Sequence, residues 1–340
     1  MTEYVVIGSG VIGLYTTFLL LEKGIHPANV SVIAEYHPGD QSINYASPYA
    51  GAYFSACIGE SLLKYSEFTY ENIHRVQQSL GKESGVDSVP STEYLDERPS
   101  SGYLKIISGF LEDFETIQDP EVPDAKFGVK YKAWVFNSPL FIGNLKSYLE
   151  KAGVRFERKI LDHIKQAFGK STKVVFNCSG NGSITMGGVE DPKCYPTRGQ
   201  VVVVNAPHVK ECVSMWGDDS TYIIKRPHSK TDEVILGGFY QEKNLDANTY
   251  GFETDDILQR TTQLYPHLLE ANPYGKTLGD LRILRVVAGA RPSRAGGPRI
   301  ELEKHEYGTV IHNYGAGGCG YLCGLGMSND AVELLEKVCK

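Results

Sequence analysis

The chain has 340 residues, of which 41% are hydrophobic and 22% charged, and its formal net charge is −7. This length suffices for two domains with a full hydrophobic core, and the composition is ordinary for a globular enzyme. The negative charge argues against a general nucleic-acid binder. No apolar run reaches the roughly 18 residues that a membrane span needs, and the N-terminus enters a strand instead of a signal peptide.

The first strand, turn and helix contain a dinucleotide-binding pattern. A buried strand is expected over residues 4–7 and a helix over 14–23. Between them the chain reads Gly8-Ser9-Gly10-Val11-Ile12-Gly13. This is G-x-G-x-x-G in its confirming context. The first glycine makes a tight turn, the second lets backbone approach a pyrophosphate, and the third lets helix and strand pack closely. The N-terminus of the helix attracts the phosphates.

A second strand with an acidic residue at its end extends this pattern. Residues 30–34 are expected to form a buried strand, and Glu35 follows it directly. An acid about 20 residues beyond the glycines accepts hydrogen bonds from a ribose hydroxyl. The pattern predicts a dinucleotide site and does not by itself separate FAD from NAD.

The next part of the chain alternates loops and helices. Small residues alternate with aromatic ones over 45–54, which indicates either a segment pressed against a flat ligand or an ordinary packed loop. Apolar spacing predicts a helix over 60–80, and Ser-Pro opens another over 138–151. The polar stretch 82–125, with its short apolar run 103–107, is expected to form sheet and connections.

The second half of the chain is expected to contain several neighbouring strands. Buried strands are predicted over 201–204, 222–224 and 234–240. A helix is predicted over 255–269, with a kink or an end at Pro266.

Two further strand-to-glycine units, 173–182 and 310–320, resemble the first one. Three such units, at the start, middle and end, predict a discontinuous nucleotide domain, an arrangement more typical of flavoproteins than of simple nicotinamide dehydrogenases. We expect a nucleotide domain of residues 1–56, 145–200 and 285–340, and a second, substrate-binding domain of residues 57–144 and 201–284.

The cysteines fit neither a disulfide framework nor a metal site. Their number is odd and their positions are scattered: Cys57, Cys178, Cys194, Cys212, Cys319, Cys323 and Cys339. We therefore expect reduced thiols in an intracellular protein, and no bound metal.

The sequence resembles the D-amino acid oxidase family, including D-aspartate oxidases, and is most similar to its fungal branch. Besides the first glycine motif, the resemblance rests on Ser47-Pro48-Tyr49-Ala50-Gly51-Ala52, Asn177-Cys178-Ser179-Gly180, Arg198-Gly199-Gln200, Gly289-Ala290-Arg291-Pro292 and His312-Asn313-Tyr314-Gly315-Ala316-Gly317-Gly318. It covers nearly the whole chain. It implies a mixed α/β fold, with a Rossmann-like FAD-binding domain and a substrate domain built on a large mixed antiparallel sheet.

The resemblance also implies chemistry and site residues. Family members hold FAD non-covalently and pass a hydride from the substrate Cα to flavin N5; the products are a 2-oxo acid, ammonia and hydrogen peroxide. Arg291 matches the arginine that grips the substrate carboxylate, Tyr222 and Tyr240 match two pocket tyrosines, and the Gly318 carbonyl matches the one that meets the substrate amine. The implied cofactor contacts are Gly8, Ser9, Gly10, Val11, Ile12, Gly13, Glu35, Tyr36, Ser47, Ala50, Gly51, Ala52, Ser179, Gly180, Arg291, Gly315, Gly317, Gly318, Gly320 and Tyr321.

The resemblance leaves open whether the substrate has a neutral or an acidic side chain. A D-aspartate oxidase needs a second cation, and Tyr240 stands where mammalian examples place an arginine. Other cations that come into question are Arg226, Lys225 and His228. The sequence therefore favours neutral D-amino acids, with a D-aspartate or D-glutamate oxidase as the alternative.

Three other classes of protein share part of this pattern: a glycine- or sarcosine-type oxidase, an NAD-dependent dehydrogenase and a non-catalytic flavin-binding protein. The resemblance further implies molecular oxygen as a co-substrate, a peroxisomal location and possible assembly as a homodimer. The sequence ends in Val338-Cys339-Lys340 without the usual peroxisomal tripeptide, so a cytoplasmic location is the alternative.

Overall fold

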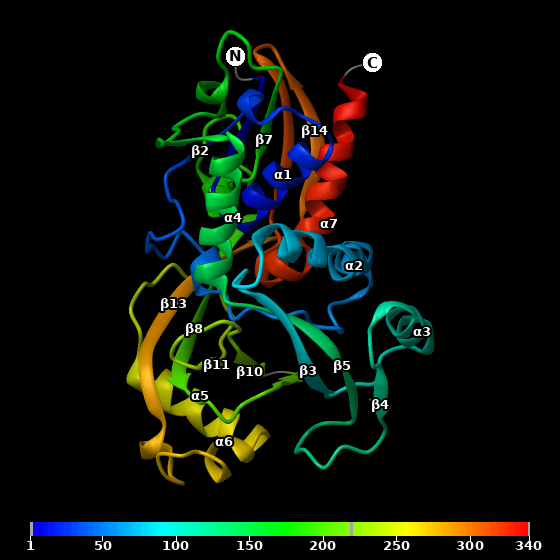
Figure 1. Cartoon of the computed structure of the whole chain (residues 1–340), viewed down its shortest axis with the longest axis vertical. Helices are drawn as coiled ribbons and strands as arrows, with labels where there is room; N and C mark the ends of the chain where they lie inside the picture. Colours follow the sequence, from blue (N-terminus) through cyan, green and yellow to red (C-terminus); the bar gives the residue numbers. More distant parts are fainter. Residues whose placement is uncertain (1–2, 218–219, 339–340) are drawn as a thin grey trace.

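Two β-sheets, one above the other in Figure 1, organise the molecule. The structure is a computed structural model that describes residues 3–217 and 220–338. Within these ranges, one sheet has six strands and the other has nine. The predicted mixed α/β fold with a large, mostly antiparallel second sheet is confirmed. Every helix in the described ranges is too short or too polar to cross a bilayer.

The six-stranded sheet is mainly parallel and begins with the predicted first strand. Its order is β14 (Arg299–His305), β15 (Gly308–Tyr314), β7 (Val174–Asn177), β1 (Tyr4–Ile7), β2 (Val30–Ala34) and β6 (Arg155–Arg158). All neighbours from β15 to β6 run parallel, whereas β14 pairs antiparallel with β15. The inner strands are apolar and buried along almost their whole length, as is typical of parallel strands that are covered on both faces.

Helices pack around this sheet and join it to the rest of the molecule. They are α1 (Val11–Glu22), α2 (Leu63–Leu80), α4 (Ser138–Ala152) and α7 (Gly320–Glu333). Helix α7 packs against both α1 and α2, and α1 also packs against α4. Short 3-10 turns lie at Pro27–Asn29, Ser47–Tyr49, Glu60–Leu62, Ile164–Ala167, Gly180–Ile184, Leu278–Asp280, Gly317–Cys319 and Leu334–Lys337.

The nine-stranded sheet contains the strands of the middle of the chain. Its order is β12 (Gln241–Glu242), β8 (Cys194–Asn205), β11 (Glu233–Gly237), β10 (Thr221–Lys225), β9 (Cys212–Trp216), β3 (Val86–Leu95), β5 (Phe127–Phe136) and β4 (Glu115–Ile117), and β13 (Arg282–Arg294) pairs with β8. Strands β3 and β9 are parallel, and the other neighbours are antiparallel.

Two helices cover the far face of this sheet. Helix α5 (Gly251–Leu264) packs against β8, β10 and β11, and α6 (His267–Glu270) follows it. The break predicted at Pro266 is present, because α5 ends at Leu264 and the proline precedes the first residue of α6. Buried aliphatic residues of the strands and helices form one core cluster there.

The expectation of sheet and connections over 82–125 is only partly correct. Strands β3 and β4 lie in this stretch, but Ser101–Phe110 forms a helix, α3. Ser100 caps it by accepting a hydrogen bond from the Tyr103 amide at 3.1 Å. Tyr103 and Ile107 are buried one turn apart, whereas Ile106 is exposed. The run over 103–107 is therefore a turn of helix whose buried face is formed by Tyr103 and Ile107, and not a strand.

The two sheets do not divide at the predicted domain boundaries. The boundaries expected at 200 and 285 fall inside β8 and β13, which are paired with each other from Cys194 to Asn205 in the nine-stranded sheet. A boundary before β8 and another after β13 would leave both sheets intact. The division into two domains remains a prediction, with these shifted limits.

Candidate functional site

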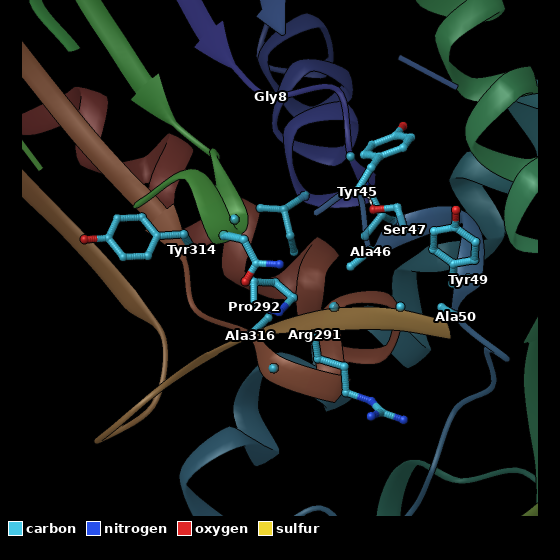
Figure 2. A pocket seen from close by; sticks show the side chains of 18 of the residues that line it. Gly8, Tyr45, Ala46, Ser47, Tyr49, Ala50, Arg291, Pro292, Tyr314 and Ala316 are labelled. Atoms are coloured by element: carbon cyan, nitrogen blue, oxygen red, sulfur yellow. Dashed lines mark hydrogen bonds between the residues drawn. The ribbon is translucent and has the colours of Figure 1, made fainter. Parts of the chain in front are cut away.

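A cavity of about 990 Å³ is lined by residues from both sheets. Figure 2 shows its span, with Gly8 at the end of β1 near the top and Arg291 on β13 toward the bottom. The loop that carries Ser47 and Tyr49 forms one side, and Tyr314 at the end of β15 lies on the other. The carboxyl ends of parallel strands are where open α/β sheets bind ligands.

The glycine motif brings backbone segments close together at the end of the cavity near Gly8. Gly8 has φ = +102°, and a Cβ there would lie 2.4 Å from the Cys178 carbonyl oxygen. A Cβ at Gly10 would lie 2.9 Å from the Ser47 hydroxyl, which accepts a hydrogen bond from the Val11 amide at 3.0 Å. A larger residue at either position would collide with these neighbours, so both positions require glycine.

The predicted cofactor residues line this cavity with one exception. Gly13 is not in the lining; a Cβ there would lie 2.0 Å from the Gly8 carbonyl oxygen. Its function is the close packing of α1 on β1. The other predicted residues all belong to the lining: Gly8, Ser9, Gly10, Val11, Ile12, Glu35, Tyr36, Ser47, Ala50, Gly51, Ala52, Ser179, Gly180, Arg291, Gly315, Gly317, Gly318, Gly320 and Tyr321. Their contact with a cofactor stays a prediction.

One part of this end of the cavity was not expected from the sequence. Residues 159–162, which follow β6, line it together with Glu35, which follows β2. Because β6 and β2 are parallel neighbours, the residues after both strands meet at one edge of the sheet. The alternation of apolar and polar residues over 154–157 is a sequence signal for this strand, but it does not show with which strand it pairs.

Buried polar atoms that have no hydrogen-bond partner in the protein indicate whether the cavity suits a dinucleotide. The hydroxyl oxygen of Ser9 and the side-chain oxygen of Asn181 are buried in the lining and have no hydrogen-bond partner among the described residues. Buried polar atoms are normally paired, so these two indicate contacts that a ligand supplies. A hydroxyl donor beside the N-terminus of α1 suits a phosphate oxygen. The residues therefore fit an elongated, phosphate-bearing cofactor.

Arg291 dominates the lower end of the cavity. One terminal nitrogen donates to the Phe239 carbonyl at 2.9 Å, and the other donates to the Tyr222 hydroxyl at 3.5 Å. No carboxylate pairs with this guanidinium among residues 3–217 and 220–338. A guanidinium carries five N–H donors in a planar fork, so donors remain for a carboxylate ligand.

Two tyrosines flank this arginine, as predicted. Tyr222 on β10 is buried, and a Cβ at Gly237 or Gly238 would lie within 2.4 Å of its side chain. The Tyr240 ring lies 4.1 Å from the Arg291 guanidinium carbon and is 49% exposed, which puts it at the mouth of the cavity. A Cβ at Gly318 would lie 3.6 Å from the Tyr240 hydroxyl. The structure thus brings together all four predicted catalytic residues.

Apolar side chains form the wall beyond these residues. The lining there includes Tyr53, Cys57, Ile58, Trp216, Ile224 and Leu322. Trp216 donates from its indole nitrogen to the buried Glu93 carboxylate at 3.2 Å, which holds the ring in place. Trp216 was not expected from the sequence, because β9 was not predicted and its pairing with β3 and β10 spans distant parts of the chain.

An ion pair behind the Gly315 turn supports the site. Asp191 accepts hydrogen bonds from Arg294 at 2.8 Å and from the Tyr314 hydroxyl at 3.0 Å. Burial by itself would raise the pKa of Asp191, but the bonds from Arg294, the Lys193 amide and Tyr314 outweigh it and lower the pKa to about 2. The ionised carboxylate is therefore part of the folded structure.

This low pKa predicts how the Asp191→Asn variant responds to acid. A lowered pKa stabilises the folded state above the unfolded value of 3.8, and that stabilisation is lost as pH falls toward 2. We expect the carboxylate to contribute about 2 kcal/mol near neutral pH, with roughly half lost by pH 3. Urea unfolding of both proteins at pH 7, 5, 4 and 3 measures this. A difference between them that stays constant down to pH 3 would contradict the assignment.

Comparisons with known proteins agree with this geometry. The family described as FAD dependent oxidoreductase matches residues 3–334. A D-amino-acid oxidase of Schizosaccharomyces pombe is 38% identical, over 98% of this chain and 95% of its own length. A D-aspartate oxidase of Cryptococcus neoformans is 30% identical, over 98% and 96%. The solved structure of glycine oxidase from Bacillus cereus superposes with a TM-score of 0.75 at 16% identity, covering 99% of this chain and 95% of that one, and shares the fold.

Proposed function

Because the chain belongs to the FAD dependent oxidoreductase family, we propose that it is a D-amino-acid oxidase with a preference for neutral D-amino acids. The observation that carries the proposal is the guanidinium of Arg291, which pairs with no carboxylate in the described part of the chain and lies at the end of the cavity away from the glycine motif. An α-amino acid presents a carboxylate that this planar fork can bind through two parallel hydrogen bonds.

The residues of the chain bind and orient the substrate. Arg291 grips the carboxylate, the Tyr222 hydroxyl beside it supplies a further hydrogen bond, and the Gly318 carbonyl accepts from the amino group. These contacts fix two substituents of Cα, the carboxylate and the amino group, and the apolar wall accepts the side chain, so that the remaining hydrogen faces the cofactor. Orientation of this kind provides much of the rate. When bound, FAD supplies the two-electron oxidation of the Cα–H bond and passes the electrons to oxygen.

No acid or base of the chain is required at the reacting carbon. Among the described lining residues there is no histidine, and the acids, Glu35 and Asp162, lie at the end of the cavity near β2 and β6. His312 is fully buried outside the lining, and burial lowers its pKa to about 4. Its side chain is hydrogen-bonded to Asn177 and Glu303, and it is a core residue.

The charges of the lining favour neutral over acidic substrates. Its cations, among the described residues, are Arg291 and Lys159, and Lys159 lies after β6. Arg226 is buried outside the lining, paired with Glu233 at 3.0 Å and donating to the Ala50 carbonyl at 3.2 Å. Lys225 and His228 are also absent from the lining. A second carboxylate on the substrate would therefore be desolvated beside apolar walls without a cation.

Anaerobic reduction by single substrates tests this function. The purified protein is checked for a flavin absorption band and mixed in turn with D-alanine, D-aspartate, L-alanine and glycine. We expect D-alanine to bleach the flavin much faster than the other three. Faster bleaching by D-aspartate would overturn the neutral preference, and bleaching by glycine alone would indicate a glycine oxidase. A bound flavin that no D-amino acid reduces would overturn the proposal.

Removing the Tyr222 hydroxyl should weaken substrate binding. We expect Tyr222→Phe to lower kcat/KM for D-alanine about tenfold, mainly through KM, because one hydrogen bond to a charged group is lost. Tyr195→Phe is the matched control, since Tyr195 lies on β8 outside the lining and bonds Glu242 at 3.2 Å. Steady-state kinetics of both variants measure the effect. An unchanged KM in Tyr222→Phe would show that the Tyr222 hydroxyl does not bind the substrate.

The homodimer and the peroxisomal location remain predictions from the resemblance. Light scattering after size-exclusion chromatography measures the mass of the assembled protein. Microscopy of an internally tagged protein distinguishes peroxisomes from cytoplasm.

A further inference from the structure

A buried carboxyl group lies behind the apolar wall of the cavity. Glu93 is on β3, is 0% exposed and is not itself part of the cavity lining. Within residues 3–217 and 220–338, no lysine, arginine or histidine forms an ion pair with it. A buried carboxylate without a cation depends on hydrogen-bond donors around it.

Four such donors converge on its two oxygens. The Ala56 amide, at 2.8 Å, and the Tyr131 hydroxyl donate to Oε1 of Glu93. The Ser55 hydroxyl, at 3.0 Å, and the Trp216 indole nitrogen, at 3.2 Å, donate to Oε2. Four donors suit the ionised form, which is an acceptor with about four lone-pair sites. Burial raises the pKa of Glu93, and the hydrogen bonds from Tyr131, Ala56 and Ser55 oppose this rise.

Two of the four donors have no other role available to them. A hydroxyl can rotate and become an acceptor, but the Ala56 amide and the Trp216 indole nitrogen can only donate. These two bond different oxygens of Glu93. An amide side chain in its place would offer one acceptor oxygen, and its NH2 group would face the other donor. The link between Trp216 and the chain at Ala56 therefore depends on the carboxylate.

The two segments that Glu93 joins both belong to the cavity wall. Ser55, on one segment, and Trp216, on the other, line the cavity. The centroids of the Trp216 and Tyr222 rings are 6.3 Å apart, and the Tyr222 hydroxyl accepts from Arg291 at 3.5 Å. The wall that Glu93 holds is thus adjacent to the guanidinium that binds the substrate carboxylate in the proposed function.

Cys57, the next residue of the first segment after Ala56, is part of the same wall. Burial and the nearby Glu93 carboxylate raise the pKa of its thiol, which therefore stays protonated. Like the other cysteines among the described residues it is a free thiol, and Cys339 lies outside those residues. The wall next to Trp216 is therefore uncharged there, which suits a neutral substrate side chain.

We propose that Glu93 is a positioning residue that limits the size of the substrate side chain, because it fixes the Trp216 ring and the segment Ser55–Ala56 relative to each other. The ring makes room for a bulky side chain only by moving, and this movement breaks its hydrogen bond to the buried carboxylate. Glu93 acts through the wall and not by touching the substrate. The identity of the substrate rests on the proposed function, whereas the width of the cavity does not.

Carboxylates that lack an amino group test this width without turnover. The flavin-loaded protein is titrated with propanoate and with 3-phenylpropanoate, which carry the side chains of alanine and phenylalanine, and the change in flavin absorption gives each Kd. We expect Glu93→Gln to shift the ratio of the two Kd values about tenfold in favour of the larger ligand, the effect of one hydrogen bond to a charged group. An unchanged ratio, or a shift in favour of propanoate, would overturn the proposal.

The same titration separates this inference from the proposed function. If the ratio shifts as expected but no D-amino acid reduces the flavin, only the proposed function has failed. If D-alanine reduces the flavin but the ratio is unchanged, only the role of Glu93 has failed. Absence of any carboxylate binding to the wild type would overturn both.

A second variant shows whether Glu93 acts through Trp216, and it tests the same contact if Glu93→Gln does not fold. Trp216→Phe removes the indole donor and should shift the ratio in the same direction. The double variant should shift it no further than the larger single effect, because both substitutions break one contact. An unchanged ratio in Trp216→Phe, or fully additive shifts, would contradict the proposal.

Tyr70→Phe is the matched control for the loss of a buried hydrogen bond. Tyr70 belongs to the core cluster against which Trp216 packs, lies outside the lining, and donates to the Lys132 carbonyl at 2.7 Å. We expect an unchanged ratio in this variant. In turnover, kcat/KM for D-phenylalanine relative to D-alanine should rise in Glu93→Gln, mainly through KM, and not in Tyr70→Phe. Equal shifts in the two variants would show that general loosening of the core, and not Glu93, sets the width.

Discussion

Replacing Arg291 by methionine should lower kcat/KM for D-alanine by about a thousandfold. Truncating one partner of a buried charge pair costs about 2–5 kcal/mol, and about 4 kcal/mol corresponds to this factor. The methionine keeps the apolar stem against the Tyr240 ring but removes every donor to the substrate carboxylate. Stopped-flow reduction of the flavin across substrate concentrations measures both binding and rate.

One further variant separates the effect of the planar guanidinium geometry from the effect of its positive charge, and another is a control. Arg291→Lys keeps the charge but not the planar geometry, and should recover only part of the loss. Arg282→Met is the matched control on the same strand, since Arg282 is exposed, outside the lining, and stacks on the Tyr274 ring at 3.8 Å. Near-normal kinetics in Arg291→Met with the flavin still bound would show that Arg291 does not bind the substrate.

Replacing Glu253 by glutamine should destabilise the fold by about 3–5 kcal/mol. The variant leaves the charge of Arg198 buried without compensation, the kind of change with this cost. Arg198 and Glu253 have side-chain exposures of 0% and 2%, and one terminal nitrogen lies 3.0 Å from both carboxylate oxygens. Arg198 also donates to the Asp246 carbonyl at 2.8 Å and to the Gln241 side chain at 2.6 Å. The pair therefore ties the segment after Tyr240 to β8.

Urea unfolding of the flavin-loaded protein measures this loss. Glu150→Gln is the control, because Glu150 pairs with Lys146 at 2.6 Å on the surface of α4, with exposures of 43% and 21%. A surface pair of this kind contributes about 0.3–0.5 kcal/mol. Equal effects of the two substitutions would contradict the structural role of the buried pair. A looser Tyr240 segment should also raise KM in Glu253→Gln, since that ring covers the guanidinium of Arg291.

The nucleotide end of the site could be predicted from sequence because its signals are local. The apolar residues of β1, Gly8 and Gly10, and the start of α1 follow one another within twenty residues. Each glycine is required by its own short-range geometry: φ = +102° at Gly8 and a close approach to Ser47 at Gly10. The break of α5 before Pro266 is equally local, because proline lacks the N–H that a helix needs.

Predictions are wrong or missing where the structure of a segment depends on residues that are far away in the sequence. The helix Ser101–Phe110 lies in a stretch for which the sequence predicts sheet and connections, because five apolar-rich residues have no decisive period until their packing is known. Residues 159–162 and Trp216 reach the cavity only through the pairing of β6 with β2 and of β9 with β3. Strand pairing of this kind depends on contacts across the fold.

The sequence by itself determined the strand–glycine–helix unit and the three glycine-rich turns, and through resemblance it named Arg291, Tyr222 and Tyr240 as candidates for substrate binding. Only the tertiary structure decided that Arg291 on β13 and Tyr222 on β10 meet at 3.5 Å, and that Arg226 lies outside the cavity. The reason is physical: local patterns follow from the backbone preferences of neighbouring residues. The distance between two side chains on separate strands follows from the register and twist of the whole sheet.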